Sequence, residues 1–195
     1  MRDKKALIWT IIIGGVLLRL VPHLPNFAPI TATALFSGAY LKKRWVILVP
    51  LLAMAASDYL LLYMHPFSAQ PFDFNKLYPL SALWHATTPY VWGSFAVSGL
   101  IGLWLGKHLK PGLVVGASVL TSLQFFIITN FGVWAAGTMY APTAAGLAQS
   151  YIMGLPFLRW TLLGDLFYAT AFFGLYALGS RKSKVVAKHG TIASL

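Results

Sequence analysis

The sequence predicts an all-α integral membrane protein, a single bundle of six transmembrane helices with both termini in the cytoplasm. Composition is the first reason: 58% of the 195 residues are hydrophobic and 10% are charged, whereas a soluble domain carries about 25% charged residues. The apolar residues also fall into six segments. Finally, the basic residues cluster at alternate ends of these segments.

Each expected span is an apolar run between charged or proline-rich connectors. A helix needs about 20 apolar residues to cross the hydrocarbon core, and fewer where neighbouring helices shield it. Within a single domain of residues 1–180, the expected spans are 6–21, 30–41, 45–64, 88–106, 112–136 and 155–178, and residues 181–195 form a basic cytoplasmic tail. The second span is too short to cross alone, so we expect a broken or tilted element. Gly112 with Gly116, and Ala34 with Gly38, have the spacing that allows close helix approach.

Basic residues set the expected orientation. Twelve of the fifteen Lys and Arg residues lie at the termini or in the connectors 42–44 and 107–110, and only Lys76 lies in the opposite connectors. The positive-inside rule then places both termini in the cytoplasm. The net charge of +11 therefore indicates membrane topology, and we expect no nucleic-acid partner.

Four ionisable residues fall within the expected spans: Arg19, Asp58, Arg159 and Asp165. Such groups are costly in a membrane, and they are usually functional or paired. All four lie in the outer half or near the midplane, which indicates a cavity open to the outside. The alternative is purely structural pairing, of Arg19 with Asp58 and of Arg159 with Asp165.

The outer connectors add polar and aromatic groups. His23 and Asn26 lie in a connector that three prolines make rigid, and the long aromatic connector 65–87 has the composition of a lid. The histidines match no zinc spacing. The residues predicted to bind a ligand are His23, Asn26, Phe27, Asp58, Tyr59, His85, Tyr90, Asn130, Trp134, Arg159 and Asp165.

Several catalytic arrangements are excluded by absence of the residues they need. The chain has no Cys and no Glu, and it lacks a Gly-x-x-x-x-Gly-Lys-Ser/Thr phosphate loop and a His-Glu-x-x-His motif. We therefore predict no enzyme activity and no intrinsic cofactor. An integral membrane enzyme acting on a lipid or isoprenoid, with Asp58, Asp165 and His23 as acid–base groups, stays as an alternative.

Five segments carry a family resemblance: RLVPHLPNFAP (19–29), ALFSGAY (34–40), SD (57–58), TNFGVW (129–134) and LPFLRWTLLGD (155–165). With them the chain, over residues 6–178, resembles a bacterial family of small membrane proteins similar to the S components of energy-coupling factor (ECF) vitamin transporters, which includes solitary cobalamin transporters. The resemblance implies the bacterial cytoplasmic membrane as location. It also implies an outward-facing pocket for a vitamin.

The resemblance makes cobalamin the first substrate expected, with another vitamin or a modified nucleobase as alternatives. Partners would be a coupling subunit with ATPases, or none. Ala6, Thr10 and Gly14 stand where S components with shared partners usually carry Ala-x-x-x-Ala, which favours a solitary transporter. Because the chain has no Cys, a bound corrinoid would take His85, His65 or no protein ligand at cobalt.

Overall fold

The structure, a computed structural model, describes residues 2–21, 24–64, 77–137 and 139–192, and within them it is all-helical, with no strand. The six α-helices are separated by connectors of different lengths, and the long one between α3 and α4 contains a 3-10 helix, η1. Their bounds are α1 Arg2–Leu18, α2 Ile30–Tyr40, α3 Trp45–Leu61, η1 Leu80–Leu83, α4 Thr88–Lys107, α5 Pro111–Ala135 and α6 Ala144–Ile192.

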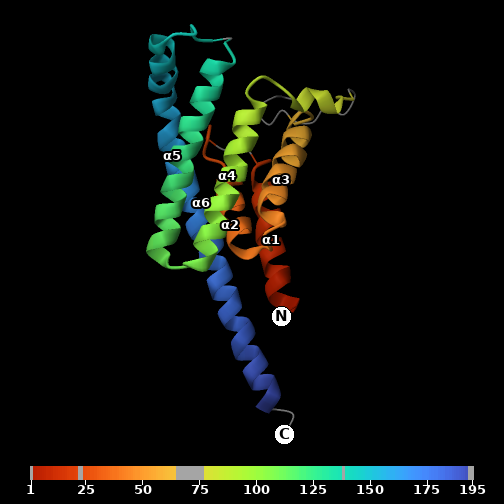
Figure 1. The fold of residues 1–195 in the computed structure, drawn as a ribbon. Coiled ribbons are helices and arrows are strands. Elements are labelled where there is room, and N and C mark those ends of the chain that lie inside the picture. The colour runs from red at the N-terminus through yellow and green to blue at the C-terminus, as the bar shows by residue number, and fades with distance from the viewer. Residues whose placement is uncertain (1, 22–23, 65–76, 138, 193–195) are drawn as a thin grey trace.

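The helices lie lengthwise side by side, and both chain termini lie at the same end of the bundle (Figure 1). The connectors between α2 and α3 and between α4 and α5 lie at this end too. These are the basic connectors 42–44 and 107–110. The connectors from α3 to α4 and from α5 to α6 lie at the opposite end. The positive charge of the connectors is thus gathered at one end of the bundle.

Five of the six expected spans coincide with helices, and most of their bounds agree to within three residues. The sixth expected span begins too late. Helix α6 starts at Ala144 and not at 155, so residues 144–154, expected to be connector, form its first turns. Proline is typical of the first turn of a helix, and Pro156 lies next to the expected start. Here Pro156 lies inside the helix.

Helix α2 is the centre of the bundle. Residues Ile30 to Gly38, all but the last two of its eleven residues, are buried, mostly against α4, α6 and α3. Close approach to α4 depends on glycine, because a Cβ on Gly38 would meet the carbonyl oxygen of Gly99 and one on Gly102 would meet that of Leu35. The expectation for Gly38 is confirmed. The expectation that Gly112 and Gly116 allow close helix approach is wrong, because both glycines face open space.

The outer faces of the helices are strongly apolar. Large aliphatic and aromatic side chains about half exposed occur on five helices: Ile13 and Leu17 on α1, Leu52 on α3, Trp104 on α4, Leu120 and Ile127 on α5, and Leu163 and Phe167 on α6. By length and composition, two helices of the described chain could cross a membrane, Pro111–Ala135 and Ala144–Ser180, and Trp45–Leu61 is apolar but shorter.

Candidate ligand-binding site

An ion pair joins α3 to the end of α1. Arg19 follows the last residue of α1, and its Nη2 lies 2.6 Å from Oδ1 of Asp58 on α3. Its Nη1 donates a hydrogen bond to the Ser57 hydroxyl, which itself donates to the carbonyl oxygen of Ala53 at 2.6 Å. The side chains of Arg19 and Asp58 are 15% and 27% exposed. The predicted pairing of these two residues is confirmed, and their charges cancel.

The connector between α1 and α2 packs against the middle of α6. The ring of Phe27 lies 5.8 Å from that of Phe167 and 5.6 Å from that of Tyr168. Gly164 makes this contact possible, since a Cβ there would lie 3.0 Å from Cα of Phe27. Beside Phe27, Asn26 adopts a positive φ of 63°, which asparagine tolerates better than most residues. The connector therefore packs on α6 through the partly buried Phe27, whereas Asn26 beside it is exposed, and it leads directly into α2.

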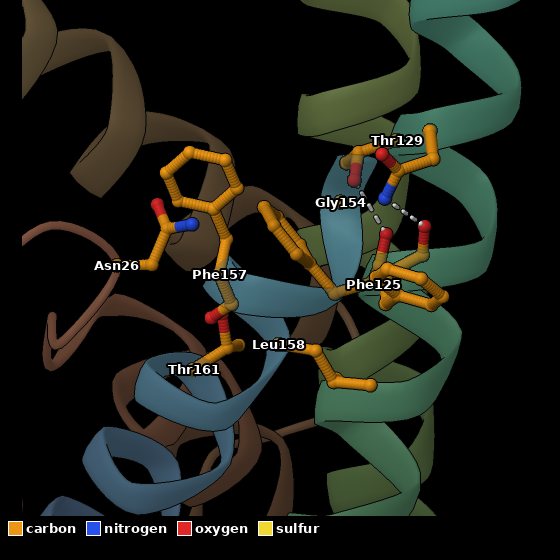
Figure 2. Close-up of a pocket in the computed structure, with 9 residues that line it drawn as sticks. Asn26, Phe125, Thr129, Gly154, Phe157, Leu158 and Thr161 are labelled. Atoms are coloured by element: carbon orange, nitrogen blue, oxygen red, sulfur yellow. Dashed lines mark hydrogen bonds between the residues drawn. The ribbon is translucent and has the colours of Figure 1, made fainter. Parts of the chain in front are cut away.

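A cavity of about 200 Å³ lies between this connector, α5 and α6 (Figure 2). Its lining comes from the second half of α5 and the first half of α6, so it lies in the half of the bundle away from the termini. Three phenylalanines and four uncharged polar side chains dominate it. The lining residues are Asn26, Phe125, Phe126, Thr129, Asn130, Gly154, Phe157, Leu158 and Thr161.

Hydrogen bonds to their own helices fix most of the polar lining groups. Thr129 and Asn130 donate to the carbonyl oxygens one turn earlier in α5, each at 2.8 Å. Thr161 does the same on α6 at 3.1 Å. Asn26 differs: its side-chain amide has no hydrogen-bond partner among the described residues, and Figure 2 shows it directed toward Phe157. It is the polar group most available to a ligand.

A second cavity of about 140 Å³ adjoins the first. Both are lined by Asn26, Phe125 and Thr161, which therefore form the boundary between them. The smaller cavity continues toward the ion pair and the start of α2. Its other lining residues are Arg19, Ala28, Ile30, Thr31, Met54, Val91 and Phe95.

Hydrogen bonds join α5 to the first turns of α6 and to the connector before it. Ser150 donates to the carbonyl oxygen of Asn130 at 2.8 Å, and the Tyr151 hydroxyl donates to that of Ile127 at 3.0 Å. Trp134 Nε1 donates to the carbonyl oxygen of Ala141 at 3.0 Å. Trp134 thus fixes the connector between the two helices and does not line either cavity.

Asp165 and Arg159 are not paired, contrary to the alternative raised from the sequence. Asp165 is 2% exposed, and its Oδ2 accepts a hydrogen bond from Ser122 at 2.7 Å; the Thr31 side chain lies near the same carboxyl group. Arg159 lies on the exposed face of α6 with its guanidinium 5.0 Å over the Trp160 ring. The two side chains are six residues apart on one helix, which places them on different faces.

Other predicted ligand-binding residues have partners elsewhere. The hydroxyl of Tyr59 lies 3.0 Å from that of Tyr63 and donates to the carbonyl oxygen of Tyr78 at 3.1 Å. His85 hydrogen-bonds the Thr88 hydroxyl at the start of α4.

Tyr90 packs against Phe131, with 6.0 Å between ring centroids. His23 and His65 lie outside the described residues, as does most of the expected lid, 65–76; its described part packs on α3. No cluster of three metal-binding side chains occurs in the part of the chain that the structure describes.

Of the predicted residues, Asn26 and Asn130 line the larger cavity, and Arg19, not predicted to bind ligand, lines the smaller one. Sequence reasoning missed the phenylalanines and threonines because it selected charged and rare polar groups. A helical spacing was available as a signal: residues 154, 157, 158 and 161, and likewise 125, 126, 129 and 130, recur at intervals of three and four on one helix face.

A family model described as "Family of unknown function (DUF6580)" matches residues 1–187. No curated protein and no solved structure matches the chain.

Proposed function

The chain belongs to DUF6580, a family of unknown function, and we propose that it is a multi-pass membrane protein that takes up a small, vitamin-sized molecule through the cavity between α5, α6 and the connector 19–29. The observation that carries this proposal is the cavity itself, which has uncharged polar and aromatic walls and lies in the half of the bundle away from the termini.

The apolar outer surface supports a membrane location. A soluble protein seldom exposes apolar patches larger than a few hundred Å², whereas here half-exposed large apolar side chains occur on five of the six helices. The proposed topology has six spans in the bacterial cytoplasmic membrane with both termini in the cytoplasm. Helix α2 is the short span, shielded from lipid by α3, α4 and α6.

The cavity walls favour a flat, uncharged ligand. Phe125, Phe126 and Phe157 offer ring faces, and Asn26 and Thr161 offer hydrogen bonds. The Arg19 guanidinium reaches only the smaller cavity and is already neutralised by Asp58. Pockets for small molecules are commonly of about 300–1,000 Å³, so the two adjoining cavities together fit a ligand at the small end of this range.

Cobalamin is less well supported than a smaller vitamin or a modified nucleobase. A corrinoid is far larger than either cavity, and no histidine is among the lining residues that could ligate its cobalt. His85 is engaged by Thr88 outside the cavities. The S-component type of mechanism, with ATPase partners or as a solitary transporter, is compatible with the smaller ligand classes.

A lipid-modifying enzyme has less support. Its proposed acid–base groups Asp58 and Asp165 would need to act on one substrate. Asp58 is held by Arg19, and Asp165 is bonded to Ser122 and lines neither cavity. Transport therefore accounts better for the cavity than catalysis does.

The ligand test is purification of the full chain in mild detergent, followed by mass spectrometry of co-purified small molecules. Thr161→Leu places a larger apolar side chain at the boundary of both cavities and is expected to lose the ligand. Thr170→Leu, on the exposed face of the same helix, is the matched control and is expected to retain it. Equal ligand content in both variants, or no bound molecule in any of the proteins, would refute the proposal.

Topology is tested separately, using the absence of Cys in the chain. Single cysteines are introduced at Lys107, beside the basic connector, and at Leu80 in η1, which is 74% exposed. A membrane-impermeant maleimide added to intact cells is expected to label the variant at position 80 and not the one at position 107. Labelling of both, or of neither, would contradict the proposed orientation.

A further inference from the structure

We propose that Asp165, together with Ser122 and Thr31, forms a proton-binding site whose occupancy is linked to that of the smaller cavity. The proton site stands on its own geometry, whereas its use in uptake rests on the proposed function. The carboxyl group is a separate site because it lines neither cavity.

The position of Asp165 makes a permanent negative charge costly. The residue is 2% exposed, and the polar groups described beside it are hydroxyl groups of α5 and α2. An isolated carboxylate in an apolar interior is far less favourable than the neutral acid. Hydroxyl groups can serve both forms, because they donate to a carboxylate and accept from a carboxylic acid.

No described cation compensates the charge. The Arg19 guanidinium is engaged by Asp58, and Arg159 lies on the exposed face of α6 over Trp160. Helix α5 contains no charged residue, and neither does α2, whose only ionisable side chain is Tyr40 at its far end. On α6 itself Tyr168 is one turn away and packs on Phe27. A proton is thus the simplest counterion.

Thr31 connects this carboxyl group to the cavity. Its side chain lies near the Asp165 carboxyl group, and the same residue lines the smaller cavity at the start of α2. Thr161, one turn before Asp165 on α6, lines both cavities. A ligand that contacts Thr31 therefore changes the surroundings of the Asp165 carboxyl group. In the other direction, protonation of Asp165 changes how the Thr31 hydroxyl is presented to the ligand.

A proton fits this site better than a metal cation. Hard metal cations take about six or more oxygen ligands. Asp165 has one hydrogen-bonded hydroxyl, that of Ser122, and Thr31 near it, and no cluster of three metal-binding side chains occurs in the described residues. Binding of sodium is kept as a distinct outcome of the test.

Infrared spectroscopy can read this proton directly, because the chain has only four Asp residues and no Glu. The full chain in detergent is titrated with acid and base while the carbonyl stretch of protonated carboxylic acids is recorded. We expect one reversible band from a buried acid, absent in Asp165→Asn and retained in Asp58→Asn. Thr31→Val removes the α2 hydroxyl near the carboxyl group and should move the midpoint of its titration by up to about one pH unit.

Thr33→Val is the matched control for the link through Thr31. Thr33 is equally buried on α2, and its hydroxyl donates to the carbonyl oxygen of Pro29 at 2.8 Å. This variant should leave the midpoint in place. A carboxylate that never protonates, or an acid that keeps its proton until the protein unfolds, would overturn the proton site. Loss of the band on replacing choline chloride by sodium chloride at constant pH would overturn it in favour of a sodium site.

Discussion

Gly154 and Gly174 allow a matched test of the larger cavity, because the two lie on the same helix and differ in their surroundings. A Cβ on Gly154 would lie 2.8 Å from Cγ of Asn130 and closer still to its Oδ1. A Cβ on Gly174 would meet nothing within 4 Å. We predict that Gly154→Ala displaces the Asn130 side chain into the cavity and that Gly174→Ala changes nothing there.

The energetic difference follows from three terms. Both substitutions replace a helical glycine by alanine, which stabilises by up to about 1 kcal/mol. Gly154→Ala also loses the hydrogen bond of Asn130 to Phe126, about 1 kcal/mol, and forces an unfavourable rotamer, about 1 kcal/mol. Gly154→Ala is therefore expected to be about 1 kcal/mol less stable than wild type, and Gly174→Ala about 1 kcal/mol more stable.

The assay is thermal unfolding of the purified chain in detergent, followed by tryptophan fluorescence. A difference of about 2 kcal/mol between the two variants corresponds to roughly 4–8 °C in Tm for a chain of this size. Ligand retention is measured on the same samples, and only Gly154→Ala should lose the ligand. Equal Tm values with ligand retained in both variants would refute the placement of Asn130 against Gly154.

Three further predictions concern the bundle. Arg19→Met leaves Asp58 unpaired and should lower the free energy of unfolding by about 2 kcal/mol, less than for a fully buried pair because both side chains are partly exposed. Adding Asp58→Leu should recover most of this loss, as measured by thermal unfolding. Additive losses would show that the two residues are not coupled. Gly102→Leu should prevent folding by separating α2 from α4, whereas Gly112→Leu should be tolerated; size-exclusion profiles compare them, and similar profiles would contradict the packing. Pro156→Ala restores one backbone hydrogen bond inside α6 and should raise Tm while weakening ligand retention, so an unchanged Tm would show that the proline costs nothing there.

Helix positions were largely predictable because breakers bound the apolar runs. Pro29 precedes α2, and basic residues separate α2 from α3. The start of α6 was missed because residues 144–154, rich in small residues, were assigned to the connector before the apolar run. The glycines showed the same limit: Gly38 and Gly112 have similar spacing to a small neighbour, but only the position of α4 decides which of them is in contact.

The candidate site was less predictable than the fold. The pair of Arg19 and Asp58 followed from charge balance, since few opposite charges were available. The surroundings of Asp165 did not, because Ser122 and Thr31 are ordinary hydroxyl residues far away in sequence. Similarly, a phenylalanine that lines a cavity has no local feature that distinguishes it from one that faces lipid or core.

The burial of α2 also constrains the order in which the chain can be assembled. In the proposed membrane topology, the eleven residues of α2 span only about 16 Å at 1.5 Å per residue, which is too short to cross a hydrocarbon core of about 30 Å alone. Three of its neighbours, α3, α4 and α6, follow it in the sequence, and only α1 precedes it. Until α4 is present, α2 can dock on α1 and α3, but Gly38 lacks the helix against which it packs. The core around α2 is therefore completed late. It forms when α2, which is already synthesised, packs between helices that follow it in the sequence.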